Sequence, residues 1–215
     1  MSRSFDAVLF DYGGVFINSP FPALERAALE IGADPPELLL IMFGPYEKDT
    51  DHPWHRLERG ELSIMEARDE LTRLCQRAGI EVDPLQLLAS IMGPKDEPKD
   101  VVMSCVRELR RDGYRTALVT NNVREARDRW RVLLRADELF DVVVDSSEIG
   151  VRKPDPAIYH RALDLLGGIE PDRAIFLDDV QSNLDAAERL GMRGIRVEDD
   201  PSRALQELRS LLAAG

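Results

Sequence analysis

Short apolar segments without polar alternation recur along the chain, and three of them end directly in polar residues. Continuous apolar runs of four or five residues are typical of strands that are covered on both faces. The first run ends at Asp11, and two later runs end at Thr120 and Asp178. The pattern predicts five strands, at 7–10, 115–119, 140–144, 174–177 and 194–197.

Apolar residues at helical spacing fill the segments that separate the later strands. This spacing predicts helices at 101–112, 124–136, 156–166 and 183–190. Asp155 and Pro156 have the residue types of an N-cap and a first helical position. Strands that alternate with helices of this length imply right-handed crossovers. We therefore expect an α/β fold, a Rossmann-like parallel sheet with helices on both faces.

Residues 18–97 interrupt this alternation, because their apolar spacing fits only helices. Ser63 and Glu66 have the spacing of a capping box. The stretch 93–100 contains glycine and prolines and is typical of a linker. We predict an α/β core made of 1–17 and 98–215, and an all-helical cap, residues 18–97, inserted after the first strand. The expected cap helices are 22–31, 35–43, 64–78 and 84–92.

The polar residues that follow the strands are candidates for one functional site, since ligands of parallel α/β sheets bind beyond the carboxyl ends of the strands. Asp11, Thr120 and the Asp178-Asp179 pair are distant in sequence, but this rule places them in one crevice. Each residue alone also fits an ordinary turn or helix cap. Their joint placement, with Lys153 ahead of a later helix, favours a site.

Composition and charge exclude several classes of protein. The 215 residues include 28 Lys and Arg against 40 Asp and Glu, a formal net charge of −12, which argues against nucleic-acid binding. No apolar run is long enough to cross a membrane or to serve as a signal peptide, so we expect no membrane partner and a cytoplasmic location. Cys75 and Cys105 are too few for a disulfide framework and are predicted to be buried.

Four motifs, in this order, resemble those of the haloacid dehalogenase-like hydrolase superfamily, and the resemblance covers nearly the whole chain. They are Phe10-Asp11-Tyr12-Gly13-Gly14-Val15, Val119-Thr120-Asn121-Asn122, Arg152-Lys153-Pro154-Asp155, and Phe176-Leu177-Asp178-Asp179 followed by Asn183. The Gly-Gly form of the first motif, with Glu58-Arg59-Gly60-Glu61-Leu62-Ser63, is similar to the branch of sugar-phosphate phosphatases and the phosphatase domain of soluble epoxide hydrolases.

This resemblance implies a Mg²⁺-dependent phosphatase that acts on a small phosphorylated metabolite through an aspartyl-phosphate. Asp11 is the expected nucleophile, and Lys153 the cation that neutralises Asp11 and a phosphate oxygen. The Thr120 hydroxyl and the backbone N–H of Asn121 are expected to bind the phosphate. The expected metal ligands are Asp11, Asp179 and the backbone carbonyl of Gly13, with Asp178 as an alternate ligand and Asn183 orienting the loop.

One position departs from the family pattern. Most phosphatases of this superfamily have a second Asp two residues after the nucleophile, which protonates the leaving group, and this chain has Gly13. His52 or His55 could supply the acid, although packing is the more common role of such histidines. Tyr12, Trp54 and Trp130 are expected to be packing residues.

Two other functions therefore stay open. One is a metal-independent dehalogenase reaction, which the paired carboxylates disfavour because they need a cation. The other is a catalytically weak phosphate-binding or regulatory protein that has lost its acid. A homodimer is also compatible with the sequence.

Overall fold

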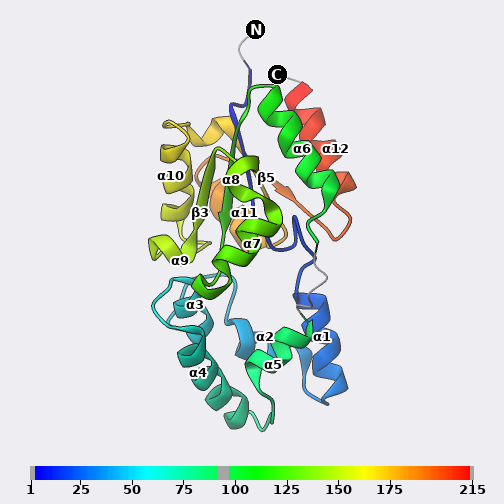
Figure 1. The fold of residues 1–215 in the computed structure, drawn as a ribbon, viewed down its shortest axis with the longest axis vertical. Helices are drawn as coiled ribbons and strands as arrows, with labels where there is room; N and C mark the ends of the chain where they lie inside the picture. The colour runs from blue at the N-terminus through cyan, green and yellow to red at the C-terminus, as the bar shows by residue number, and fades with distance from the viewer. Residues whose placement is uncertain (1–2, 92–96, 214–215) are drawn as a thin grey trace.

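The structure, a computed structural model, describes residues 3–91 and 97–213. Its core is a parallel sheet in the order β3-β2-β1-β4-β5 (Figure 1). The predicted strands are confirmed to within two residues at each end. Their bounds are β1 (Ala7–Phe10), β2 (Arg115–Thr120), β3 (Val142–Asp145), β4 (Ala174–Asp178) and β5 (Arg193–Arg196).

Helices cover both faces of the sheet, as expected. Successive residues of a strand point to opposite sides, so a fully apolar strand has apolar side chains to bury on both faces. In β1, Val8 and Phe10 pack into the core of one face, while Ala7 and Leu9 pack into the core of the other. The first face is covered by α6 (Asp100–Arg111), α7 (Arg127–Leu134), α8 (Ala136–Leu139) and α12 (Ser202–Ala213). The second is covered by α10 (Pro156–Leu165) and α11 (Gln181–Arg189).

The chain departs from the expected helix 124–136. It forms a 3₁₀ turn (Arg124–Ala126), then α7, and breaks at Arg135, whose φ is 53°. The break turns the chain so that Leu134, Ala136 and Leu139 are all buried, which one continuous helix would not achieve. Other elements not predicted are α9 (Ser146–Ile149), a 3₁₀ turn (Pro171–Arg173) and α12.

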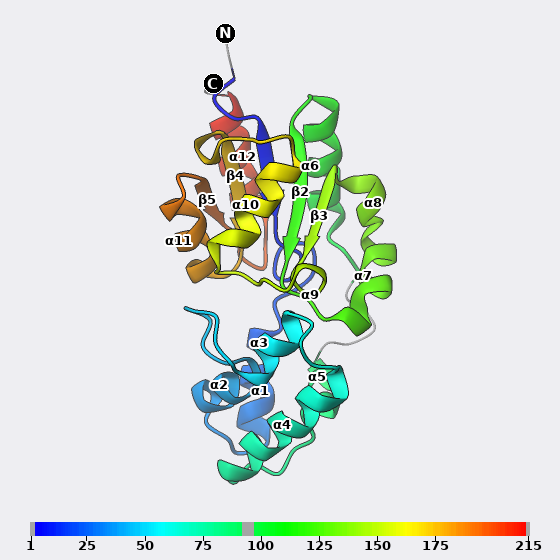
Figure 2. The same ribbon diagram turned by 90° about the vertical axis from the view of Figure 1, so that its left-hand side faces the viewer.

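The described residues of the predicted cap form five helices, gathered at the carboxyl ends of the strands (Figure 2). They are α1 (Phe21–Glu30), α2 (Pro35–Phe43), α3 (Pro53–Glu58), α4 (Ile64–Arg77) and α5 (Pro84–Ile91). Their own apolar core includes Leu24, Leu38 and Cys75. The capping box of Ser63 and Glu66 is formed. The segment that contains His52 and His55, which lies outside the predicted cap helices, holds the short helix α3.

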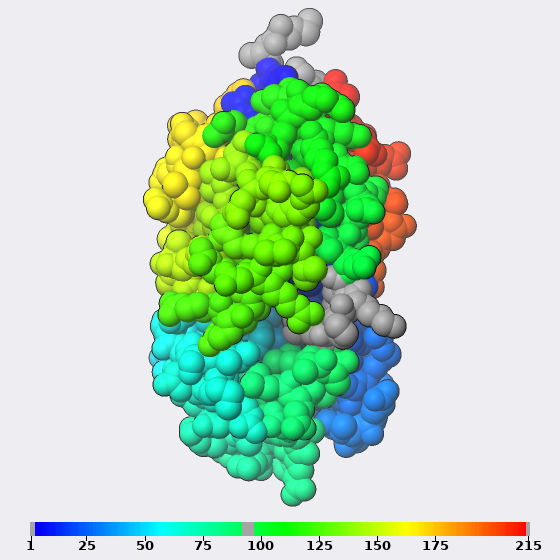
Figure 3. All heavy atoms as spheres, in the orientation of Figure 1, coloured from blue at the N-terminus to red at the C-terminus, as the bar shows by residue number. Residues whose placement is uncertain are grey.

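The cap lies directly against the core in the space-filling view (Figure 3). The backbone N–H of Ile64 donates to Glu125, and the Ser182 hydroxyl donates to the carbonyl of Tyr46. The division at 17/18 and 97/98 stays a prediction, and part of the predicted linker, with Met92, lies outside the described residues.

Two further expectations concern cysteines and membranes. Cys75 and Cys105 are both free and buried, as predicted. Within the described ranges, no helix has the length and apolarity that a membrane span requires.

Candidate active site

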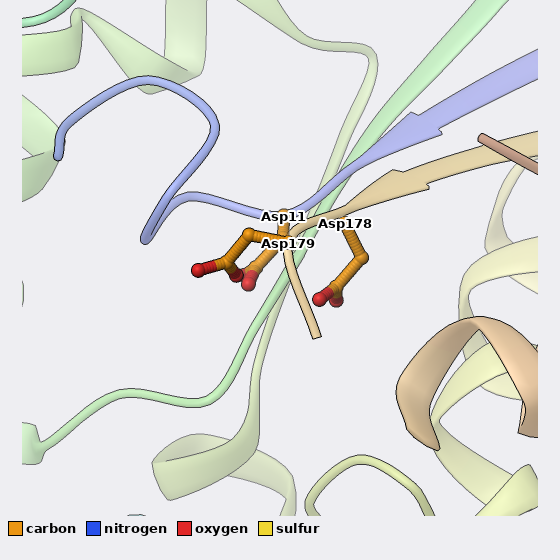
Figure 4. Close-up of side chains that lie close together, drawn as sticks. All are labelled: Asp11, Asp178 and Asp179. Carbon is orange, nitrogen blue, oxygen red and sulfur yellow. The ribbon is translucent and has the colours of Figure 1, made fainter. Parts of the chain in front are cut away.

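The ends of two adjacent strands bring the predicted acidic residues together. Asp11 follows β1, Asp178 ends β4, and these two strands are neighbours in the sheet. Each of Asp11, Asp178 and Asp179 offers a carboxylate oxygen, and these oxygens lie within 4.8 Å of one another. Figure 4 shows the three side chains grouped where β1 and β4 end. The structure therefore brings these three residues together at the strand ends, as the sequence predicted.

Lys153 joins two of these carboxylates. Its Nζ lies 2.8 Å from Asp11 Oδ1 and 2.8 Å from Asp178 Oδ2, and its side chain is buried. The side chain of Asn121 clamps the Lys153 backbone, since Nδ2 donates to the Lys153 carbonyl at 3.0 Å and Oδ1 accepts from the Lys153 N–H at 2.8 Å. Asn121 therefore fixes the lysine in place, a contact that the motifs did not indicate.

Asp178 and Asp179 differ in their surroundings. Asp178 is fully buried, and Oδ1 accepts from the Val180 N–H at 2.7 Å while Oδ2 accepts from Lys153. Asn183 Nδ2 lies 3.1–3.2 Å from both oxygens, which agrees with its expected orienting role. Asp179 is only partly buried and lines the cavity described below. Asp178 is thus held by the protein, whereas Asp179 faces open space.

The local charge balance is unusual. Burial raises the pKa of Asp11 to about 8, against the opposing effect of Lys153. Burial, followed by the charge of Asp178, raises the pKa of Asp179 to about 6. Three clustered carboxylates share one lysine, so the ionised cluster is favoured when a cation is added. Oxygen donors of this kind fit Mg²⁺.

Two glycines follow the expected nucleophile, and they differ in the space around them. A Cβ at Gly13 would meet nothing within 4 Å, and its φ lies outside the left-handed region. Gly14 has a φ of +71°, and a Cβ there would lie 2.1 Å from the Asp179 carboxylate. Glycine is therefore required at Gly14 and not at Gly13.

A cavity of about 650 Å³ lies between the strand ends and the cap. Asp11, Gly13, Thr120, Lys153 and Asp179 line it from the core. Thr120 is buried, and its hydroxyl lies 3.4 Å from the Asn121 carbonyl. These predicted groups thus share one cavity with the cap, which is the arrangement expected of an enzyme pocket.

The two candidate histidines do not belong to this cavity. Neither His52 nor His55 is among its lining residues, and His55 is fully buried. Nδ1 of His55 accepts the Thr50 N–H at 3.0 Å. Burial lowers the pKa of His52 to about 4 and, with the charge of Arg152, that of His55 to about 3. The suggestion that either residue protonates the leaving group is wrong, because both are packing residues of the cap.

The expected packing residues largely behave as predicted. Tyr12 and Trp130 are buried against each other, with ring centroids 5.4 Å apart. Trp54 packs against Phe43 at 5.0 Å, and it also lines the cavity.

A buried ion pair between core and cap was missed by the sequence argument. Arg152 is fully buried, and its Nε lies 2.7 Å from Glu58 Oε2. The other oxygen of Glu58 accepts the Trp54 indole N–H at 2.8 Å, and the Glu58 carbonyl accepts the Ser146 hydroxyl at 2.6 Å. Arg152 and Glu58 each belong to a quoted motif, but their sequence separation gives no signal of pairing.

Comparison with known proteins gives a consistent result. The chain is 34% identical over 212 residues to mouse acyl-CoA dehydrogenase family member 10 (98% of this chain, 19% of that protein). It is 29% identical over 210 residues to rat bifunctional epoxide hydrolase 2 (93% and 37%). It is 30% identical over 133 residues to glyceraldehyde 3-phosphate phosphatase of Methanopyrus kandleri (58% and 56%). The chain therefore spans well under half of the first two relatives.

Solved structures share the fold. A dehalogenase crystal structure with an intermediate complex has a TM-score of 0.67 and 22% identity, covering 99% of both chains. A HAD family enzyme from Bacteroides thetaiotaomicron, in complex with magnesium and inorganic phosphate, has a TM-score of 0.60 and 21% identity, covering 89% of this chain and 93% of that one. A family model described as haloacid dehalogenase-like hydrolase matches residues 5–191. The chain belongs to the haloacid dehalogenase-like hydrolase family, and it has a five-stranded parallel sheet with an acidic cluster at the strand ends.

Proposed function

We propose that this hydrolase is a Mg²⁺-dependent phosphatase that forms an aspartyl-phosphate on Asp11. One observation carries the proposal: Asp11, Lys153 and Asp179 meet at the floor of the cavity, and Asp178, which is fully buried, contacts Lys153. A nucleophilic carboxylate with a fixed cation beside it suits attack on a phosphate group. The similarity to a named phosphatase over part of the chain supports the same reaction class.

The chain's own residues divide the work. The Asp11 carboxylate attacks phosphorus, the bond from phosphorus to the ester oxygen breaks, and the alkoxide departs with that oxygen and takes a proton from water, because Gly13 offers no proton donor. Water then attacks the phosphorus of the aspartyl-phosphate, which releases inorganic phosphate and restores Asp11. Lys153 holds Asp11 through Oδ1 and offers positive charge to a phosphate oxygen. The Thr120 hydroxyl lines the same space and would donate to another oxygen.

The contacts favour different roles for the two paired carboxylates. Both oxygens of Asp178 already accept hydrogen bonds, so we assign Asp178 to positioning Lys153. Asp179 faces the cavity and would hold the metal together with Asp11 and the Gly13 carbonyl. A bound Mg²⁺ would neutralise the phosphate and the carboxylates that face it.

The test begins with p-nitrophenyl phosphate, whose leaving group needs no proton donor. We expect turnover in Mg²⁺, loss of turnover in chelator, and recovery on adding Mg²⁺ back. Asp11→Asn keeps the side-chain shape but removes the nucleophile, so acid-stable incorporation of phosphate should disappear together with turnover.

Other outcomes would point to the open alternatives. Chloride release from chloroacetate in the presence of chelator, without phosphatase activity, would contradict the phosphatase proposal and favour dehalogenation. Tight binding of phosphate with no turnover of any phosphate ester would favour a binding or regulatory protein.

A further inference from the structure

The walls of the catalytic cavity differ sharply in character. The floor carries Asp11, Lys153 and Asp179, whereas four aromatic side chains of the cap form a cluster above it. These are Phe21, Phe43, Tyr46 and Trp54, all of which line the cavity. Phe43 lies edge-on to Phe21 at 5.5 Å and to Trp54 at 5.0 Å, and Phe21 lies edge-on to Tyr46 at 4.9 Å. The cap thus presents a mainly apolar surface to the phosphate site, with Asn18 and Ser19 as polar members of its lining.

Charged groups are scarce on the cap side. Of the side chains that helices α1–α5 contribute to the cavity within their described residues, only Arg26 and Glu58 are charged. Arg26 is exposed to solvent. Both oxygens of Glu58 are occupied, one by the Trp54 N–H and the other by Arg152. The Trp54 indole N–H is bound to Glu58, so neither the indole nor the Glu58 carboxylate is available to bind the hydroxyls of a sugar.

The core side extends the apolar surface beyond the floor. Val123, Ala126 and Leu133 line the cavity, together with Asn122 and Arg129 of the same segment. Leu133, near the end of α7, is 45% exposed and so brings the apolar wall to the surface. At about 650 Å³, the space falls within the usual range for pockets that hold drug-sized ligands. This is far more room than a phosphate group alone requires.

We propose that the substrate is a phosphate monoester of an apolar alcohol, with its hydrocarbon part held between the cap aromatics and α7. The inference rests on the proposed phosphatase function and names its substrate class. Transfer of an alkyl chain from water to this wall is favourable. A polyhydroxylated alcohol would lose hydrogen bonds to water with few replacements from the cap helices, which is unfavourable.

The test compares butyl, hexyl and octyl phosphate, below their micelle concentrations, with glycerol 3-phosphate and glucose 6-phosphate. The alkyl substrates have leaving groups of equal basicity, so chain length reports burial rather than the ease of bond breaking. We expect kcat/KM to rise about two- to fourfold per added CH₂. Octyl phosphate should therefore exceed butyl phosphate at least tenfold, and exceed both polar substrates. A flat dependence on chain length, or a preference for glucose 6-phosphate, would overturn the proposal.

Alkylphosphonates separate this inference from the phosphatase proposal, because they cannot be hydrolysed. Octylphosphonate should bind in Mg²⁺ at least tenfold more tightly than butylphosphonate by calorimetry. That result without turnover of any ester would support the apolar site and contradict the phosphatase function. Equal affinities, with p-nitrophenyl phosphate turned over, would contradict the apolar site alone.

A pair of neighbouring residues supplies matched variants. Leu133→Asn places an amide on the apolar wall and should lower the octyl-to-butyl ratio of kcat/KM. Val132→Asn makes a similar change one residue away, at a side chain that is 75% exposed and does not line the cavity. It should leave the ratio at the wild-type value. If the two variants had equal octyl-to-butyl ratios of kcat/KM, the alkyl chain of the substrate would not lie along α7.

Discussion

The buried pair of Arg152 and Glu58 leads to a quantitative prediction about stability. The Arg152 side chain is fully buried, the Glu58 side chain is 5% exposed, and their contact is 2.7 Å long. Arg152 Nη1 and Nη2 have no hydrogen-bond partner within the described part of the chain, and its second acidic neighbour, Asp49, lies 3.6 Å away. The Arg152 charge therefore depends mainly on one carboxylate.

Glu58→Gln keeps the shape of the side chain and removes that charge. Breaking a buried pair from one side typically costs about 3–5 kcal/mol, because the remaining charge is left uncompensated. The amide still accepts a hydrogen bond, so we expect the lower value, about 3 kcal/mol. For a chain of this length that loss lowers Tm by about 6–12 °C.

Thermal and urea unfolding followed by circular dichroism measure this loss, and an exposed pair provides the control. Arg193 and Glu207 are 2.8 Å apart, a similar distance, but their side chains are 50% and 41% exposed. Glu207→Gln should therefore cost no more than about 1 kcal/mol. The double variant Glu58→Gln/Arg152→Met should recover part of the loss, since it removes the unpaired charge. Equal effects of Glu58→Gln and Glu207→Gln, or a double variant less stable than Glu58→Gln, would refute the reasoning.

Three other predictions concern catalysis and pH. Lys153→Met should lower kcat on p-nitrophenyl phosphate by about 10²–10³-fold, because the lysine stabilises charge on the phosphate. The Tm measured in Mg²⁺ should change much less. A large fall in Tm with little change in kcat would show that the lysine is structural. Because Gly13 cannot protonate a leaving group, aryl phosphates should be hydrolysed about 10²–10⁴ times faster than alkyl phosphates. Gly13→Asp, which the open space around Gly13 admits, should narrow that gap, and a wild-type rate independent of leaving-group basicity would contradict the argument. The pKa values of His52, about 4, and His55, about 3, lie below the value of 6.5 that a histidine has in the unfolded chain, so protonation of these side chains favours unfolding. The free energy of unfolding should therefore be highest above pH 6.5 and should fall as the pH drops toward 4. Unfolding free energies measured from pH 7 to 4.5 should show this fall, and His55→Gln should reduce its slope.

Most of the fold could be predicted from the sequence, because the residue patterns that define its strands are local. The run Ala7 to Phe10 has no polar residue, so it predicted a strand buried on both faces, and both faces are covered. The polar residues after the strands then located the acidic cluster without any contact information. Helix α3 was missed because its six residues are too few to show a helical period.

The electrostatics of the cap could not be read in the same way. A glutamate and an arginine in a sequence are normally exposed, and only the fold shows that Glu58 and Arg152 are buried together. The two histidines had the opposite outcome. They suggested chemistry by residue type, but the packing of the cap places them away from the cavity.

The central position of β1 affects how the chain reaches its native state. Ala7 pairs with Arg115 on one side and with Ala174 on the other, so β1 precedes both of its partner strands and is distant from them in sequence. At about 5–20 residues per second, a ribosome needs about 5–20 s to reach Arg115 after Phe10. During that time the apolar β1 segment has no partner strand, whereas all residues of the cap's own apolar core precede Arg115 in the chain. Pairing of β1 is a long-range step of the kind that slows folding and exposes a chain to aggregation.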